Sequence, residues 1–164
     1  TVPLFELRLR LLDDLISAPH PLMSQAELHF QRGNMRRALF PGDLSATNLA
    51  LGDLHTAMHL AYAEGDPEIR ASATAAWART LAWIESSGIE DVKARLIEAG
   101  QAIDQALKLV LPPFHQAVLH QARAHLMRPA SPADAAKAFE LALSLVSEDS
   151  PLWSELAAEM VATR

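Results

Sequence analysis

The sequence predicts an all-α protein made of stacked antiparallel helical hairpins, with about eight helices. Hydrophobic residues make up 50% of the 164 residues, many of them alanine and leucine, whereas aromatic residues make up only 5%. Such a composition favours helices over strands. Four prolines, Pro21, Pro67, Pro113 and Pro151, each open an apolar stretch, and they recur at intervals of 46, 46 and 38 residues. A repeat of about 40 residues is typical of stacked helical hairpins.

The first helix is expected over residues 4–17, where leucines recur at helical spacing. Prolines in the segment 18–21 end it, because proline cannot continue a helix and disfavours helical geometry in the residue before it. This helix is rich in leucine on more than one side, so we expect it to pack against another element or another chain.

The second helix is expected over residues 22–32, but the sequence also allows a later start and a later end. Ser24 and Glu27 have the spacing of a capping box, so the helix could also begin between residues 23 and 25. Gly33-Asn34 is a candidate break. Without that break the helix extends to Leu39, before a loop that contains a proline and a glycine.

The remaining helices are expected over residues 45–63, 67–85, 90–110, 113–127, 132–146 and 151–162. The sharpest boundary is Gly65-Asp66-Pro67, where glycine suits a helix C-cap, aspartate an N-cap and proline the first helical position. Short loops make consecutive helices antiparallel neighbours. We expect the second helix to pair with the third, the fourth with the fifth and the sixth with the seventh, in one helical-repeat domain over residues 1–164 that is part of a larger protein.

A small-large-small pattern recurs in the second helix of each expected hairpin. Its copies are Leu54, Met58 and Ala61; Ala99, Ile103 and Ala106; Ala135, Phe139 and Ala142; and, more weakly, Leu11, Leu15 and Ala18. Small residues around one bulky residue let two helices approach closely.

These residues, together with Trp153-x-x-Leu156-Ala157, resemble the motifs of the tetratricopeptide repeat family. That family has Trp-x-x-Leu-Gly in the first helix of a repeat and Ala-x-x-x-Phe-x-x-Ala in the second. The period here is longer than 34 residues, as in the loose repeats of bacterial signalling and transcriptional regulators similar to the maltose activator. The resemblance implies a tetratricopeptide-like α-solenoid with a role in signalling or transcription regulation.

Composition and charge exclude several classes of function. The net charge is −6 and no basic patch is evident, so this segment is not expected to bind nucleic acid. It has no apolar run of membrane-spanning length and no cysteine for disulfides or thiolate metal sites. We expect a cytoplasmic location as the default.

No catalytic or cofactor motif is evident, so we expect no enzyme activity, no cofactor and no metal site. His55 and His59 lie one helical turn apart and could share a cation, but a third ligand is not identifiable. Histidines at 115, 120 and 125 fall on different sides of one helix.

Aligning the hairpins on Trp153 predicts a groove that could hold a peptide or a small effector. The groove residues are Ser24, Gln31, Arg70, Thr74, Trp77, Gln116, His120 and Arg123. Trp77 would be the apolar anchor, although it is equally compatible with a core position. The sequence therefore predicts a non-enzymatic module that binds a protein, a peptide or a neighbouring domain. A sensor for a small effector and a homodimer through a terminal hairpin are the alternatives.

Overall fold

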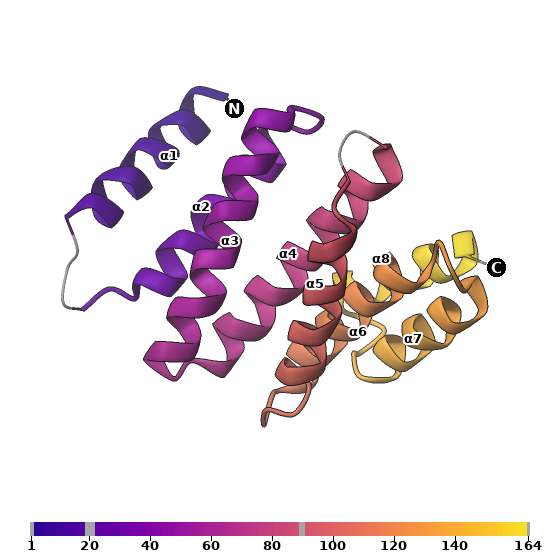
Figure 1. Ribbon diagram of the computed structural model, residues 1–164. Helices are drawn as coiled ribbons and strands as arrows, with labels where there is room; N and C mark the ends of the chain where they lie inside the picture. The colour runs from indigo at the N-terminus through magenta and orange to yellow at the C-terminus, as the bar shows by residue number, and fades with distance from the viewer. Residues whose placement is uncertain (1, 19–21, 89–90, 164) are drawn as a thin grey trace. The chain divides into compact units, whose positions relative to one another are not determined.

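The structure, a computed structural model, describes residues 2–18, 22–88 and 91–163, and these residues form eight α-helices (Figure 1). The helices are α1 (Val2–Ser17), α2 (Gln25–Leu39), α3 (Leu44–Glu64), α4 (Pro67–Ser87), α5 (Lys93–Ala106), α6 (Pro113–Met127), α7 (Pro132–Ser144) and α8 (Pro151–Thr163). The all-α prediction is confirmed. Pro21 and Glu90, which the sequence suggests as helix boundaries, lie outside the described residues.

Local capping signals determine where several helices begin. The Ser24 hydroxyl accepts a hydrogen bond from the Glu27 N–H at 3.1 Å, so α2 begins at Gln25, as the capping-box spacing predicts. At the joint between α3 and α4, Gly65 has a φ of 72° and is the C-cap of α3. Asp66 then accepts from the Ile69 N–H at 3.0 Å and caps α4. Both boundaries match the sequence prediction.

Two helices are shorter than predicted, because their last turns tighten. Helix α5 ends at Ala106 rather than at residue 110, and α7 ends at Ser144 rather than at residue 146. Beyond these ends the N–H groups donate to carbonyls three residues back, as Lys108 does to Gln105 at 3.2 Å. Apolar residues keep their helical spacing in the sequence through such a turn. Their pattern therefore does not show where the α-helical hydrogen bonds end.

Helix α2 runs through Gly33 to Leu39, so the longer of the two predicted extents is confirmed and the candidate break at this glycine is absent. A Cβ atom at Gly33 would lie 2.9 Å from Leu54 Cγ and 3.2 Å from the Ala50 carbonyl oxygen. The glycine therefore lets the α2 backbone approach α3 closely, rather than ending the helix.

The chain divides into two compact units, Thr1–Ala73 and Thr74–Arg164, with the boundary inside α4. In the first unit α1 packs on α2 and α2 packs on α3; in the second, α5 packs on α6, α6 on α7 and α7 on α8. The predicted pairings of α2 with α3 and of α6 with α7 are confirmed. The pairing of α4 with α5 and the single continuous stack remain predictions.

The small-large-small pattern marks core positions in three of its four copies. Leu54, Met58 and Ala61 of α3 are buried, as are the corresponding residues of α5 and α7. In the second unit, Phe139 of α7 is fully buried in a cluster with alanines of α6 and α7 and leucines of α8. The copy in α1 differs, because Leu11 is exposed and Leu15 is only partly buried. Helix α1 therefore turns part of its apolar surface outward.

Candidate functional site

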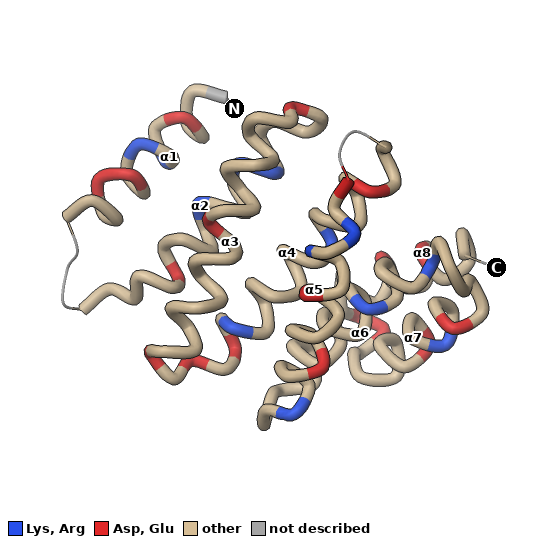
Figure 2. Tube along the Cα trace, viewed as in Figure 1, with Lys and Arg blue, Asp and Glu red and all other residues tan. Residues whose placement is uncertain are grey.

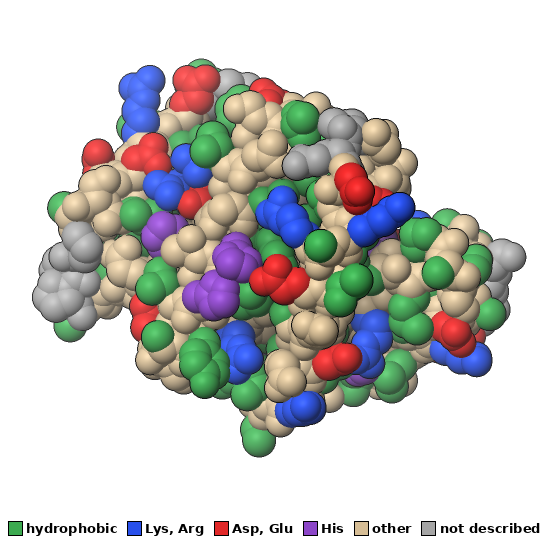
Figure 3. Space-filling model, viewed as in Figure 1, with side chains coloured by type: hydrophobic (Ala, Val, Ile, Leu, Met, Phe, Trp, Pro, Cys, Tyr) green, Lys and Arg blue, Asp and Glu red, His purple; other side chains and the backbone are tan. Residues whose placement is uncertain are grey.

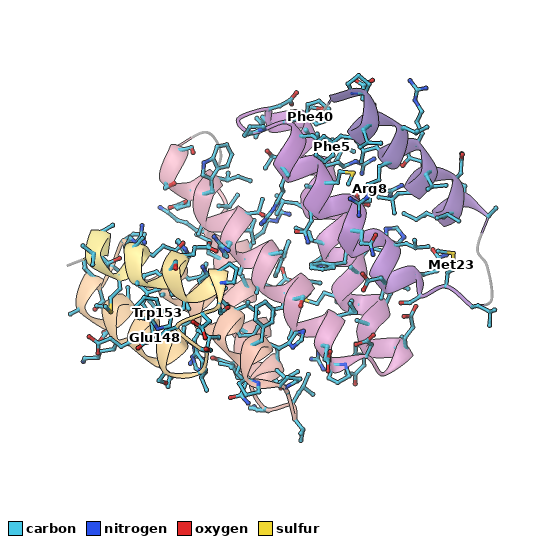
Figure 4. All side chains as sticks on the ribbon, turned by 180° about the vertical axis from the view of Figure 1, so that it is seen from behind. Phe5, Arg8, Met23, Phe40, Glu148 and Trp153 are labelled. Carbon is cyan, nitrogen blue, oxygen red and sulfur yellow. The ribbon has the colours of Figure 1, made fainter. Side chains whose placement is uncertain are left out.

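A cleft between α1 and α2 is the candidate binding site of the first unit. It encloses about 330 Å³ and is lined by Arg8, Leu11, Leu12, Leu15, Leu22, Met23, Ser24, Glu27, Leu28 and Gln31. Figure 4 shows Arg8 on α1 and Met23 just before the start of α2. We call this feature the α1–α2 cleft. Its size lies at the lower end of the range of small-molecule pockets.

The apolar lining of the cleft follows from how α1 docks. Leu12 of α1 and Leu28 of α2 are both buried, and they hold the two helices together. Leu11, one residue before Leu12, is exposed, as is Met23 in the segment before α2. The cleft thus has buried leucines at its base and exposed apolar side chains at its opening, which is the arrangement of a surface that can receive another apolar group.

Polar groups of opposite charge border the cleft. Arg8 comes from α1, and Glu27 comes from the first turn of α2. Gln31 donates a hydrogen bond to the Glu27 carboxylate at 2.7 Å, which orients that carboxylate. Ser24 caps α2, and its hydroxyl also donates to the Glu64 carboxylate of α3 at 2.8 Å. The Ser24 hydroxyl is therefore engaged in structural hydrogen bonds.

A charged cluster next to the cleft ties α1, α2 and α3 together; we call it the Asp53 cluster. Asp53 is only 4% exposed. Arg32 donates to both of its oxygens, with Nη2 at 2.7 Å from Oδ1 and Nε at 3.0 Å from Oδ2, and Arg36 Nη1 lies 2.6 Å from Oδ2. His29 Nδ1 lies 3.4 Å from Oδ1. Bidentate arginine contacts of this kind are strong and geometrically specific.

The same cluster reaches α1 through Asp13. Arg32 Nη1 donates to Asp13 Oδ1 at 2.8 Å, although Asp13 itself is about half exposed. The hydrogen bond with Asp53 raises the pKa of Arg32 above its ordinary value; burial opposes that rise, and Asp13 reinforces it. Because removing one partner of a buried charged group is costly, this network favours a single position of α1 against α2.

The second unit contains its own polar cluster, centred on the buried Gln121 of α6. The Gln121 amide donates to Glu155 Oε1 and to Glu159 Oε2 of α8, each at 3.0 Å. His125 Nε2 lies 3.0 Å from Glu159 Oε1, and Arg79 Nη2 donates to Glu155 at 3.0 Å. These contacts hold α8 against α6.

The pKa of Glu159 lies below its ordinary value. Burial disfavours the charged form, but the hydrogen bonds from His125 and Gln121 and the charges of His125 and Arg79 outweigh that effect. Glu159 is therefore an ionised structural carboxylate at neutral pH.

The structure places the predicted groove residues of the first unit in different settings. Ser24 and Gln31 both line the α1–α2 cleft. The Arg70 guanidinium instead lies over the Tyr62 ring, 4.8 Å from its centroid, in a cation–π contact. Only part of the predicted set therefore shares one site in this unit.

Thr74 and Trp77 are buried, which corrects the expectation that they line an accessible groove. Each is only 1% exposed. The physical reason is the composition of α4: Ala71, Ala73 and Ala78 are also fully buried, so this helix is enclosed on several sides. Trp77 is a core residue and cannot act as a surface anchor.

The other predicted groove residues of the second unit have structural contacts. The Gln116 amide donates to the Leu111 carbonyl at 2.9 Å, and Arg123 pairs with Asp104 of α5. His120 is partly buried, and this burial lowers its pKa, which favours the neutral ring. Most residues of the cleft were missed by the sequence prediction. The signal that could have found them is the leucine content of α1 on more than one side.

His55 and His59 lie together on α3, as their spacing predicts. Their Nε2 atoms are 3.2 Å apart, and the rings meet edge to face with centroids 4.4 Å apart. Figure 3 shows adjacent histidine side chains at the surface of the protein. Among the described residues, no group of three or more histidine, cysteine or acidic side chains is arranged to hold a metal ion.

Comparisons with known proteins identify no relative of this chain. No protein-family model matches it, and neither a curated protein nor a solved structure gives a significant match. None of the described helices has the length and apolar character needed to cross a membrane.

Proposed function

We propose that this chain is a non-enzymatic protein-interaction module that receives an apolar peptide or helix of a partner in the α1–α2 cleft. The observation that carries the proposal is the lining of the cleft, where leucines and Met23 surround about 330 Å³ beside exposed apolar side chains. A regulatory role in a larger signalling or transcriptional protein, in the cytoplasm, is the biological setting that we propose for it.

The chemistry of the cleft supports binding rather than catalysis. Arg8, Glu27 and Gln31 border it, and these side chains can orient a partner by charge and hydrogen bonding. Ser24 is engaged as the cap of α2 and as a donor to Glu64 of α3, so its hydroxyl serves the packing of these two helices. The carboxylates of the Asp53 and Gln121 clusters are held by arginine, histidine or glutamine and serve helix packing.

Site-specific photo-crosslinking would test this proposal. A photoreactive amino acid placed at Met23 should capture a discrete partner in cells, whereas one placed at the exposed Ile97 of α5 should not. Leu22→Asp should reduce the capture at least about tenfold, because a charge in an apolar contact costs 2 kcal/mol or more. Leu22 is 88% exposed, so this substitution leaves the fold intact. Equal capture at Met23 and Ile97 would contradict the proposal.

A sensor for a small effector is a second candidate, and the size of the cleft favours it. A volume of about 330 Å³ can hold a small ligand, and polar groups from both helices converge on it. In this case a photoreactive amino acid at the position of Met23 would capture no protein. A small molecule would instead raise the unfolding temperature in a concentration-dependent way. Filling the cleft with Met23→Trp should remove that shift.

A further inference from the structure

His55 and His59 form a pair of imidazoles at the surface of α3 that the proposed function does not use. They are one helical turn apart, about 40° from each other around the helix. His59 is exposed and His55 is partly buried. The residues that line the α1–α2 cleft all precede α3 in the chain. We call His55 and His59 the histidine pair.

The two Nε2 atoms of the pair lie at the separation that a shared metal ion requires. They are 3.2 Å apart, and the ring planes are inclined by 74°. Imidazole nitrogens bind zinc at about 2.0–2.1 Å. Two such bonds place the nitrogens about 3.3–3.4 Å apart at a tetrahedral angle and about 2.9 Å apart at a right angle. The observed distance lies between these values, so the rings only need to turn toward a common point.

We propose that the histidine pair is a binding site for a divalent transition-metal ion of the zinc, nickel and copper class, with both Nε2 atoms as ligands. The described residues contain no group of three or more histidine, cysteine or acidic side chains arranged to hold a metal. The pair therefore supplies two ligands and water supplies the others. This open shell differs from that of a structural zinc site, which four protein ligands close.

The protons on the two rings determine how the ion enters. In the neutral pair, the hydrogen bond between the Nε2 atoms requires one ring to carry its proton on Nε2 and the other to carry it on Nδ1. Ligation needs a lone pair on each Nε2, so the donor ring moves its proton to Nδ1. The ion thus replaces one hydrogen bond with two coordinate bonds. Acidification releases the ion, because it protonates the nitrogens that act as ligands.

The type of ligand determines which ions bind. Imidazole suits zinc, nickel and copper, whereas magnesium and calcium prefer oxygen ligands. The charge on α3 is also favourable to a cation, because the two charged residues of this helix, Asp53 and Glu64, are acidic. Figure 2 shows most of α3 in tan, and the helix contains no basic residue that would repel the ion.

The face of α3 beside the pair is open. Gly52 lies three residues before His55 and is exposed, and a Cβ atom there would meet no other atom within 4 Å. Water therefore has access to the ion. Since two protein ligands contribute less than the four of a structural site, we expect a dissociation constant for zinc on the order of 1–100 µM.

Calorimetric titration of the full chain with zinc chloride, nickel chloride and magnesium chloride tests the site. Zinc and nickel should bind with one ion per chain, and magnesium should not bind. His55→Gln and His59→Gln should each weaken zinc binding at least about tenfold, because glutamine has a similar size but lacks the imidazole nitrogen. Circular dichroism checks that both variants fold.

A variant with an unchanged number of histidines distinguishes chelation from general binding to histidine. His59→Gln combined with Thr56→His keeps the seven histidines of the chain, but it puts the two rings on adjacent residues, about 100° apart around the helix. Thr56 and His59 are both exposed, so the fold should be retained. This double variant should bind zinc as weakly as His59→Gln alone.

Two further measurements locate the ion. In nitrogen NMR spectra of the imidazole rings, zinc should shift the Nε2 signals of His55 and His59 and leave those of the other histidines unchanged. Zinc should also raise the unfolding temperature of the wild type in a concentration-dependent way, because it binds the folded state. The unfolding temperature of His59→Gln should not respond at the same zinc concentrations.

Several results would overturn this inference. Zinc binding that survives His59→Gln, equal binding by the double variant, or no binding at zinc concentrations up to about 1 mM would each exclude the site. A ratio of one ion to two chains would also contradict it, because histidines of a second copy, rather than water, would then complete the shell. Photo-crosslinking at Met23 tests the proposed function separately, so either proposal can fail while the other stands.

Discussion

Gly33 shows how one residue determines the distance between two helices. Its Cα lies against α3 so closely that a methyl group would meet both the Leu54 side chain and the Ala50 carbonyl oxygen. Leu54 is fully buried and cannot turn outward, and the carbonyl belongs to the helix backbone. Gly52, on α3, is exposed, and no atom would contact a Cβ there. Gly52 therefore provides a control position for a substitution at Gly33.

We expect Gly33→Ala to destabilise the protein by about 1–2 kcal/mol, because overpacking outweighs the gain of about 1 kcal/mol in helix propensity. Gly52→Ala should instead stabilise it by about 0.5–1 kcal/mol. Urea unfolding followed by circular dichroism measures both. A stabilising Gly33→Ala would show that α2 and α3 are not in close contact at this point.

At the scale of the element, α8 is attached to α6 through ionisable groups as well as through apolar packing. Glu159 accepts from His125 and Gln121 of α6. Its pKa is below the ordinary value of 4.5, so its ionised form stabilises the folded state above about pH 4.5. This contribution is lost as the pH falls through the lower pKa of the folded state.

We expect Glu159→Gln to lower the free energy of unfolding by about 1 kcal/mol at pH 7, because hydrogen bonds to a charged acceptor are lost. The difference between wild type and variant should shrink as the pH falls below 4.5. Urea titrations at several pH values measure it. The control is Glu148→Gln, an exposed carboxylate in the loop before α8. A difference that persists at pH 3 would show that the ionised carboxylate is not the stabilising form.

The sequence predicts the helices better than it predicts the site, and the reason is physical. Helix starts depend on neighbouring residues, so Ser24 with Glu27, and Gly65 with Asp66, mark their boundaries correctly. Core positions repeat with the helical period, so Phe139 and its counterparts can be identified. The cleft, in contrast, depends on where α1 docks, which is determined by a contact between distant residues such as Asp13 and Arg32. The sequence leaves Trp77 either as a groove anchor or as a core residue, because its burial depends on several elements together.

At the scale of the whole molecule, the two compact units share one helix. Their boundary, between Ala73 and Thr74, lies within α4. Fraying of α4 on one side of this boundary removes helical hydrogen bonds that support the other side. We therefore expect the chain to unfold as one cooperative unit.

Fluorescence can test this coupling, because the tryptophans at 77, 83 and 153 all lie in the second unit. Gly33→Ala changes only the first unit, yet it should lower the urea midpoint seen by tryptophan fluorescence as much as the midpoint seen by circular dichroism. If the fluorescence midpoint stays at its wild-type value while the circular dichroism midpoint falls, the units unfold independently.

The Asp53 cluster also limits how this sequence can diverge. Arg32 and Arg36 share the buried Asp53, and Arg32 extends to Asp13. Loss of Asp53 alone would leave two arginines facing each other beside a hydrophobic core, and loss of Arg32 alone would leave Asp53 only partly compensated. Single substitutions in this group should therefore destabilise the fold, whereas joint replacement of the group by apolar residues of similar volume should preserve it. Among descendants of a common ancestor, these positions should be inherited as a set, and a lineage that has lost one charge should have lost the others.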